Sequence, residues 1–416
     1  MLYLQWLITA SLVLFPVVAL PVKGGANKCI YLLLLISLIC IVLRCKPMGQ
    51  TFSQVLKKYW PIHLSMAGTV VAILITQILS GRFNGNVYDI PSRLAFFAPI
   101  MWLLLLLPLE HLKKIQWGMV AGALVAAIKI HFAAEGLPAP PMNIDFINRI
   151  PYGDITLLLG VFSLLSIGWS ERTEKWAIAL KAAGGCAGLY TVYFSQARGG
   201  WIAIPVFAVV GLAIYGDVFS RRRLAVFALA VALLGAAFSF SDIVRFRIEE
   251  ADSDIGQYLD GANADTSIGL RFQLWRGSWV LFKEHPLTGV GRDRFAPEAL
   301  NELHERGIIS AAATGFGHSH SEFFYNIAVL GIFGLISFFA IYIVPGYYFY
   351  RAACEPDKEL KAAGGMGLAL CLGYFIFGLT EAIFHTPIAC AFYSICAAAF
   401  MAYIVKRRHI LAKQWK

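Results

Sequence analysis

The stretch GFGHSHSEFFYNIAVLGIFG, residues 315–334, joins a long polar segment to an apolar run and decides how the rest of the chain is interpreted. Its first half places His318 and His320 on either side of Ser319. From Phe323 the chain continues without a charge to residue 348, which exceeds the roughly 20 residues that cross a bilayer core. The stretch therefore predicts a membrane helix whose entrance carries two side chains that can exchange protons near neutral pH.

Similar apolar runs recur along the whole chain. Hydrophobic residues make up 58% of it and charged residues 14%, against roughly 25% charged residues in an ordinary globular domain. The pattern predicts an all-α, polytopic helical membrane protein with about 12 transmembrane helices. The expected spans are about 2–20, 28–44, 61–80, 93–109, 117–133, 152–170, 176–196, 200–215, 223–241, 322–348, 362–383 and 387–405. The first span lacks a basic leader and is expected to be retained, not cleaved.

The basic residues indicate how the spans are oriented. The chain has a net charge of +10, and most of its Lys and Arg residues fall in alternate short connections and in the tail after Lys406. The positive-inside rule then predicts that both termini are cytoplasmic in the bacterial inner membrane. The charge excess is explained by this topology, so we expect no nucleic-acid partner. The eight cysteines, most of them in or beside apolar runs, are expected to be small buried hydrophobes.

The polar segment after the ninth span is expected to be a large helical periplasmic loop. The chain divides into spans 1–9 (1–241), this loop domain (242–321), and spans 10–12 with the basic tail (322–416). A loop of this length is expected to fold and to carry function. Residues 267–284 have an amphipathic helical pattern that His285 and Pro286 end, and a second helix is expected at about 296–306.

Arginines on the predicted outer side are candidates for binding an anion. Arg198 precedes Gly199 and Gly200, which permit close approach of the backbone to a ligand. Arg271 and Arg276 lie on the amphipathic helix of the loop. Guanidinium groups bind phosphate oxygens in pairs, so the three predict a pyrophosphate site. Alternatively, Arg198 is a membrane-surface anchor and Arg271 forms an ion pair within the loop.

The two histidines have three interpretations. They could ligate zinc, but the sequence offers no third ligand at a familiar spacing, so no metal is expected. They could simply begin the tenth helix. The functional interpretation makes His320, with His318 beside it, a general base that Glu322 orients. Glu381, near the outer end of the eleventh span, and His385 are further candidates for lining a cavity or orienting the base.

Three motifs, in this order, resemble those of the O-antigen ligases, which share a domain with O-antigen polymerases and bacterial protein O-oligosaccharyltransferases. They are SQARGGW (195–201), RFQLWRGSW (271–279) running into HPLTGVG (285–291), and HSHSEFFYNIAVLGIFG (318–334). The resemblance is firm over about 185–345. In the wider family the second histidine is often followed by Asn; here Ser321 follows His320.

The resemblance implies a function. Arg198 and Arg271 would hold the pyrophosphate of an undecaprenyl-diphosphate-linked O-antigen, and His320 would fit the family's essential histidine. The glycan would pass en bloc to the lipid A–core oligosaccharide on the periplasmic side, with inversion and with neither metal nor other cofactor. Within the family, O-antigen polymerase and protein O-oligosaccharyltransferase are the alternatives. A secondary transporter is the alternative from another class, but the polar residues gather on one side, not at midplane in paired halves.

Overall fold

The computed structural model describes residues 2–135, 137, 140–169, 175–216 and 242–414, and these are almost entirely helical. The long helices are α1 (Leu2–Val18), α2 (Gly25–Val42), α4 (Trp60–Ser80), α8 (Ile115–Ala134), α9 (Arg149–Leu165), α10 (Lys175–Ser195), α11 (Arg198–Tyr215), α13 (Asp242–Leu259), α14 (Ser267–Glu284), α16 (Glu322–Ala353), α17 (Lys358–Thr380) and α18 (Pro387–Gln414). The shorter ones are α3 (Phe52–Lys58), α5 (Asp89–Ala95), α6 (Phe97–Leu104), α7 (Leu109–Lys113) and α15 (Leu300–Glu305). Two-residue strands β1 (Asn143–Ile144) and β2 (Ile147–Asn148) form a small hairpin before α9.

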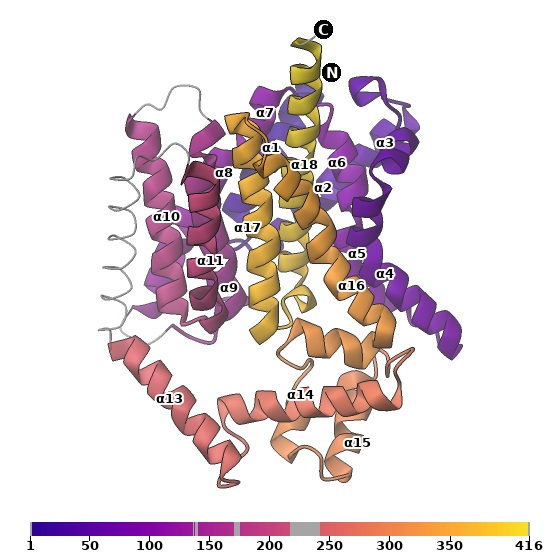
Figure 1. Ribbon diagram of the computed structural model, residues 1–416, viewed down its shortest axis with the longest axis vertical. Helices are drawn as coiled ribbons and strands as arrows, with labels where there is room; N and C mark the ends of the chain where they lie inside the picture. Colours follow the sequence, from indigo (N-terminus) through magenta and orange to yellow (C-terminus); the bar gives the residue numbers. More distant parts are fainter. Residues whose placement is uncertain (1, 136, 138–139, 170–174, 217–241, 415–416) are drawn as a thin grey trace.

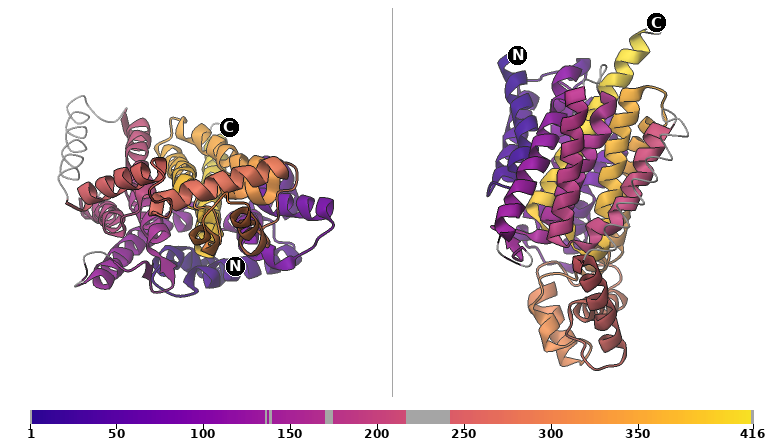
Figure 2. Two further views of the ribbon diagram at one scale, coloured as in Figure 1. Left: turned by 90° about the horizontal axis from the view of Figure 1, so that it is seen from below. Right: turned by 90° about the vertical axis from the view of Figure 1, so that its left-hand side faces the viewer.

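The helices form an elongated bundle with a separate group of helices at one end. Figure 1 shows α13, α14 and α15 below the bundle, while both chain termini lie at the opposite end. The right-hand view of Figure 2 shows the same arrangement from the side. The first helix therefore begins, and the last helix ends, at the same end of the bundle. We call α13–α15 and their connections, residues 242–321, the loop domain.

Nine helical segments of the described chain are long and apolar enough to cross a membrane, and each corresponds to one of the expected spans. Three expected spans have no counterpart among these nine segments. Helix α1 has 17 residues, and the expected span 223–241 lies outside the described residues. The expected span 93–109 is divided between α5 and α6. The division falls at Phe96 because the ring of Pro99 clashes with the carbonyl of residue 95 in a continuous helix.

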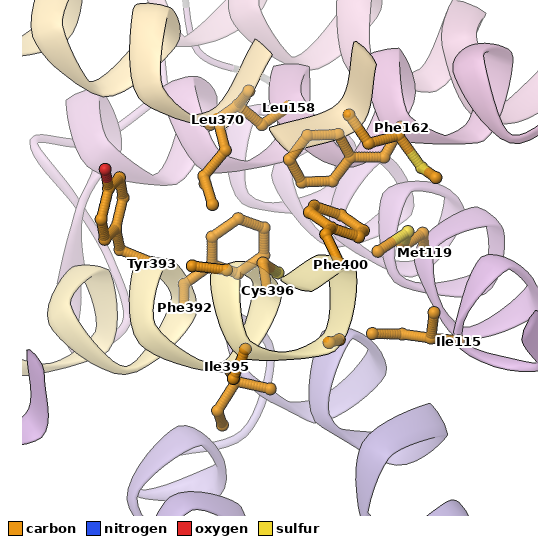
Figure 3. Close-up of a cluster of buried hydrophobic side chains, with 14 of the residues drawn as sticks. Ile115, Met119, Leu158, Phe162, Leu370, Phe392, Tyr393, Ile395, Cys396 and Phe400 are labelled. Atoms are coloured by element: carbon orange, nitrogen blue, oxygen red, sulfur yellow. The ribbon is translucent and has the colours of Figure 1, made fainter. Parts of the chain in front are cut away.

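Helix α18 forms the centre of the bundle. Every side chain from Ala389 to Val405 is buried. Figure 3 shows Phe392 and Phe400 of α18 packed with Phe162 of α9, whose ring lies 6.2 Å from the first and 5.2 Å from the second between centroids. Each aromatic pair of this kind adds about 0.5–1.5 kcal/mol beyond its buried area.

Small residues let neighbouring helices approach closely. A Cβ added at Gly160 of α9 would lie 2.9 Å from the carbonyl oxygen of Gly184 and 3.1 Å from Cα of Gly188, both in α10. Larger side chains cannot occupy such a contact, so the glycines set the spacing of these two helices.

The loop domain has its own core, which extends onto two helices of the bundle. Leu274, Leu281, Phe295, Leu300 and Leu303 are buried together in it. The same cluster includes Ala72 and Ile73 of α4 and four residues at the start of α16, which are Tyr325, Ala328, Val329 and Leu330. The domain is thus fixed against α4 and α16.

The turn formed by residues 286–291 of the loop domain inserts into a break in helix α16. Gly331 interrupts the helix with φ 58° and ψ −139°, a conformation essentially restricted to glycine. The freed carbonyls of Ala328 and Val329 accept hydrogen bonds from Val290 and Gly291, and the N–H of Ile332 donates to the carbonyl of Pro286. The HPLTGVG motif is therefore a structural element that inserts into α16.

Candidate active site at the outer end of the bundle

His320, His318 and Glu381 form a compact cluster at the end of the bundle that carries the loop domain. Nδ1 of His320 lies 3.1 Å from Oε2 of Glu381, and Nε2 of His318 lies 3.4 Å from Oε1 of the same carboxylate. Glu381 immediately follows α17, so the end of this helix supplies the carboxylate. Only 11% of its side-chain surface is exposed, against 20% for each histidine.

The hydrogen bonds assign a role to each ring nitrogen. The backbone N–H of His320 donates to Nδ1 of His318, at 3.2 Å, so the proton of neutral His318 is on Nε2 and faces Glu381. Burial lowers the pKa of His318 to about 4 despite the nearby carboxylate, so this ring is neutral at pH 7. Nδ1–H of His320 donates to Glu381, which leaves its Nε2 with a lone pair to accept a proton.

Glu381 is a carboxylate at neutral pH. Burial by itself raises its pKa, but the hydrogen bond from His320, the electrostatic interaction with the two imidazoles and the charge of Arg271 outweigh burial and leave the pKa below its ordinary value. A buried carboxylate that orients an imidazole is the arrangement that activates histidine bases in hydrolases.

His320 itself has a left-handed backbone with φ 48°. Such a conformation is uncommon for a residue other than glycine, and it costs of order 1–3 kcal/mol when the surroundings enforce it. Here Ser319 Oγ donates to the carbonyl of Ser321, and Trp275 Nε1 donates to the carbonyl of Ser319, at 3.0 Å each. These two hydrogen bonds hold the backbone conformation that directs the side chain of His320 toward Glu381.

The expected role of Glu322 as the partner of His320 is corrected by the structure. Oε1 of Glu322 accepts a hydrogen bond from Asn326, at 2.7 Å, and Oε2 accepts one from the backbone N–H of Phe384, at 3.0 Å. Glu322 is buried and holds the segment that follows Glu381, and Glu381 is the carboxylate that contacts His320. His385, in the 3-10 turn η7 (Ile383–His385), packs its ring 5.0 Å from that of His318.

Helix α14 brings Arg271 to this cluster. Arg271 and Trp275 are four residues apart and so share one face of the helix, and Trp275 stacks on Phe324 of α16. Within the described chain Arg271 has no salt-bridge partner, its Nε is buried without a hydrogen bond, and Nη1 contacts only Ser267. Burial, reinforced by the charges of Arg198 and Arg247, lowers its pKa, and the charge of Glu381 opposes this. A partly buried guanidinium with spare donors is suited to bind an anion.

Further arginines surround the start of α11. Arg198, the first residue of α11, lies 3.1 Å from Glu250 of α13, and Arg247 lies 2.5 Å from the same carboxylate. Arg247 also donates to Oε1 of Gln196, a residue with a left-handed φ of 56° in the break between α10 and α11. Sequence analysis missed Arg247; its signal was the helical spacing of three residues to Glu250.

The start of α11 is packed tightly enough to fix Arg198. A Cβ at Gly200 would lie 2.2 Å from Cγ2 of Val192 and 2.9 Å from Oδ1 of Asp154, and one at Gly199 would lie 2.8 Å from Oγ1 of Thr380. Thr380 immediately precedes Glu381. The glycines therefore bring the arginine end of α11 beside the helix end that supplies the carboxylate.

The structure does not bring Arg276 into this group. It is exposed on α14, and five residues along a helix turn its direction roughly 140° from that of Arg271. The third pyrophosphate residue expected from the sequence is thus separate, and Arg247 lies with Arg198 instead.

The cluster also contains enough ligands for a metal ion to be considered. His318, His320 and Glu381 each offer one ligand atom, and these atoms all lie within 4.8 Å of one another. The expectation of no metal relied on the lack of a third ligand at a familiar spacing, and Glu381 now fills that place. The residues present fit either a metal or a hydrogen-bonded imidazole–carboxylate pair.

The fold and this cluster define a polytopic membrane protein with a histidine–carboxylate pair and partly buried arginines at one end of its bundle. Residues 183–339 match the family model described as O-Antigen ligase, and this match supports membership of the O-antigen ligase superfamily. The match contains Arg198, Arg271 and His320, whereas Glu381 lies outside it.

One relative extends the similarity beyond the matched domain. A Haemophilus influenzae protein (strain ATCC 51907 / DSM 11121 / KW20 / Rd) described as an uncharacterized protein is 25% identical over 298 residues. The alignment covers 70% of this chain and 72% of the relative.

Proposed function

We propose that this protein transfers an O-antigen glycan en bloc from undecaprenyl diphosphate to the lipid A–core oligosaccharide, at the periplasmic face of the inner membrane. The observation that carries the proposal is the hydrogen bond between His320 Nδ1 and Glu381, which leaves Nε2 of His320 free to take a proton. Membership of the superfamily supports a lipid-linked glycan as donor. The excess of basic residues at the other end of the bundle supports a periplasmic site.

The reaction is a single displacement at the anomeric carbon of the donor. Nε2 of His320 takes the proton of the acceptor hydroxyl, whose oxygen forms the new bond to that carbon. The bond from the carbon to the diphosphate oxygen breaks, and undecaprenyl diphosphate leaves with the electron pair. One displacement inverts the configuration and needs no covalent enzyme intermediate.

The arginines stabilise the leaving group. Negative charge grows on the diphosphate as the bond breaks, and fixed guanidinium groups in a partly dehydrated site stabilise that charge more in the transition state than in the ground state. Arg271 has a hydrogen-bond donor without a partner. Arg198 and Arg247 both form ion pairs with Glu250, and a bound diphosphate would replace this carboxylate or bind beside it. Glu381 compensates the positive charge that forms on His320 during proton transfer.

A reconstituted assay tests the proposal. Purified protein in nanodiscs receives undecaprenyl-diphosphate glycan and lipid A–core without metal or nucleotide, and glycan-capped lipid A–core is the expected product. Longer lipid-linked chains formed from the donor alone would identify a polymerase, and glycosylated pilin would identify a protein O-oligosaccharyltransferase. Uptake of a solute with no transfer by folded protein would favour a transporter.

A further inference from the structure

A cavity lies between the outer end of α4 and the turn that inserts into α16. Thr76, Gln77 and Ser80 of α4 line one side, and Thr288, Gly289 and Gly291 of the turn line the other. Its inner part has a volume of about 80 Å³. Ser80, Arg82, Thr288 and Arg294 also line a wider opening of about 320 Å³, so the two parts are continuous. Hydroxyl, amide and backbone groups of this kind suit a sugar.

Three arginines give the inner part of the cavity a positive charge. Arg82, Arg292 and Arg294 line it, and Asp293 is the one acid among its lining residues, where it accepts a hydrogen bond from Asn84 at 3.0 Å. The wider opening adds Glu298 and Glu302, and Glu298 lies 3.6 Å from Arg294. Positive charge therefore concentrates at the inner end.

The inner end leads toward the histidines. The guanidinium of Arg292 lies over the ring of Tyr325, at 5.2 Å from its centroid. The ring of Tyr325 is 5.6 Å from that of His385, which is 5.0 Å from that of His318. A continuous row of side chains thus connects the cavity to the proton-accepting cluster.

The cavity and the helices that carry Arg198 and Arg247 lie on different sides of the molecule. Figure 1 shows α11 and α13, which carry these arginines, at the left of the view, and α4 at the right. The view from below in Figure 2 separates the same elements. In an inverting displacement the acceptor and the leaving diphosphate approach the anomeric carbon from opposite faces, so the side away from Arg198 is where an acceptor would enter.

We propose that this cavity is the acceptor subsite and that Arg82, Arg292 and Arg294 bind an anionic group of the acceptor oligosaccharide, a phosphate or a sugar carboxylate. The proposal rests on the proposed function for the identity of the acceptor. Binding the anion in the cavity holds a neighbouring sugar hydroxyl toward His320.

Kinetics on single variants test it. Arg82→Gln and Arg294→Gln each remove one guanidinium group. Each substitution is expected to raise KM for the acceptor about tenfold, while KM for the glycan donor stays within twofold. Arg292 is left intact because it contacts Tyr325. Arg276→Gln is the matched control, since Arg276 is exposed on α14 of the same loop domain and lines neither part of the cavity. An unchanged acceptor KM, or a raised donor KM instead, would overturn the proposal.

A binding measurement keeps the result independent of turnover. Fluorescent lipid A–core is titrated against the wild-type protein and both variants in nanodiscs without donor. Weaker binding by the variants supports the subsite even if the wild-type protein transfers no glycan. Absence of transfer together with this binding difference would contradict the proposed function but not the subsite. Equal binding by all three proteins, or none by the wild type, contradicts the subsite. Dephosphorylated and carboxyl-reduced acceptors identify the group, since removal of the recognised anion abolishes the difference between wild type and variants.

Discussion

Nδ1 of His320 and Oε2 of Glu381 lie 3.1 Å apart although 61 positions separate the two residues in the chain. The left-handed backbone of His320 and the end of α17 at Thr380 together create this contact. The carboxylate fixes the tautomer of His320 and so determines which nitrogen faces the substrate. Several expected outcomes depend on it.

Replacing Glu381 with Gln should lower kcat for transfer by roughly 10²–10⁴-fold, because the amide supplies no negative charge to the imidazolium that forms. KM for both substrates should change little, and His320→Ala should abolish transfer. Initial rates in nanodiscs measure both effects. Glu110→Gln, an exposed carboxylate 3.7 Å from Lys113, is the control. Near-normal kcat in folded His320→Ala protein would exclude His320 as the base.

The protein should become less stable as the pH is lowered, because His318 and His385 are neutral in the folded state. Burial lowers the pKa of both His318 and His385 to about 4, below the ordinary value of about 6.5. The unfolded chain therefore binds protons first as the pH falls, and stability decreases from about pH 6.5 to about pH 4. The loss for His318 amounts to at most about 3 kcal/mol.

Thermal unfolding in detergent at pH 7.5, 6.0 and 5.0 measures this dependence. His385→Gln should show a smaller fall in melting temperature than the wild type, since glutamine does not titrate. A variant whose melting temperature falls as steeply as that of the wild type would show that His385 has an ordinary pKa.

Arg271→Ala should raise KM for the donor and lower kcat, together a loss of at least about 100-fold in kcat/KM, because a partly buried cation beside the leaving group is removed. Arg271→Lys should recover only part of the loss, since an ammonium group cannot bind two phosphate oxygens in parallel. Arg276→Ala, on another face of the same helix, should change kcat/KM less than threefold. Equal losses at Arg271 and Arg276 would contradict the separation of their roles.

Gly331→Ala should destabilise the protein by about 2 kcal/mol or more and reduce transfer. The new Cβ would lie 2.6 Å from the backbone of Leu287 and would require a side chain at φ 58° and ψ −139°. Gly211→Ala, in a helix with no atom within 4 Å of the added Cβ, should be neutral or slightly stabilising. Melting temperatures of the two variants give the comparison, and similar values would argue against the inserted turn.

Removing metal ions should leave transfer unchanged if His318, His320 and Glu381 act as a hydrogen-bonded group. Rates are compared before and after dialysis against EDTA, with the metal content of the protein measured in parallel. Activity that disappears in EDTA and returns with one divalent ion would make these three residues ligands and would require another base.

Much of the architecture followed from patterns that are local in the chain. Long apolar runs predicted the starts of nine of the long helices to within four residues, because only an internally hydrogen-bonded helix is stable in a bilayer. The helix predicted at 267–284 begins and ends as expected, with Thr266 capping its first turn and His285 following its last residue. The motifs also brought Arg198, Arg271 and His320 together as one candidate site.

The sequence could not determine which residues contact one another in the folded protein. Glu322 is two positions from His320 and was the expected partner, yet it faces Asn326 and the backbone of Phe384, while Glu381 from another helix takes its place. Helix periodicity records which faces are buried, and the bilayer fixes the length of each span. The pairing of His320 with Glu381 and the insertion of the Pro286–Gly291 turn into α16 depend on how the helices pack, which only the tertiary structure decides.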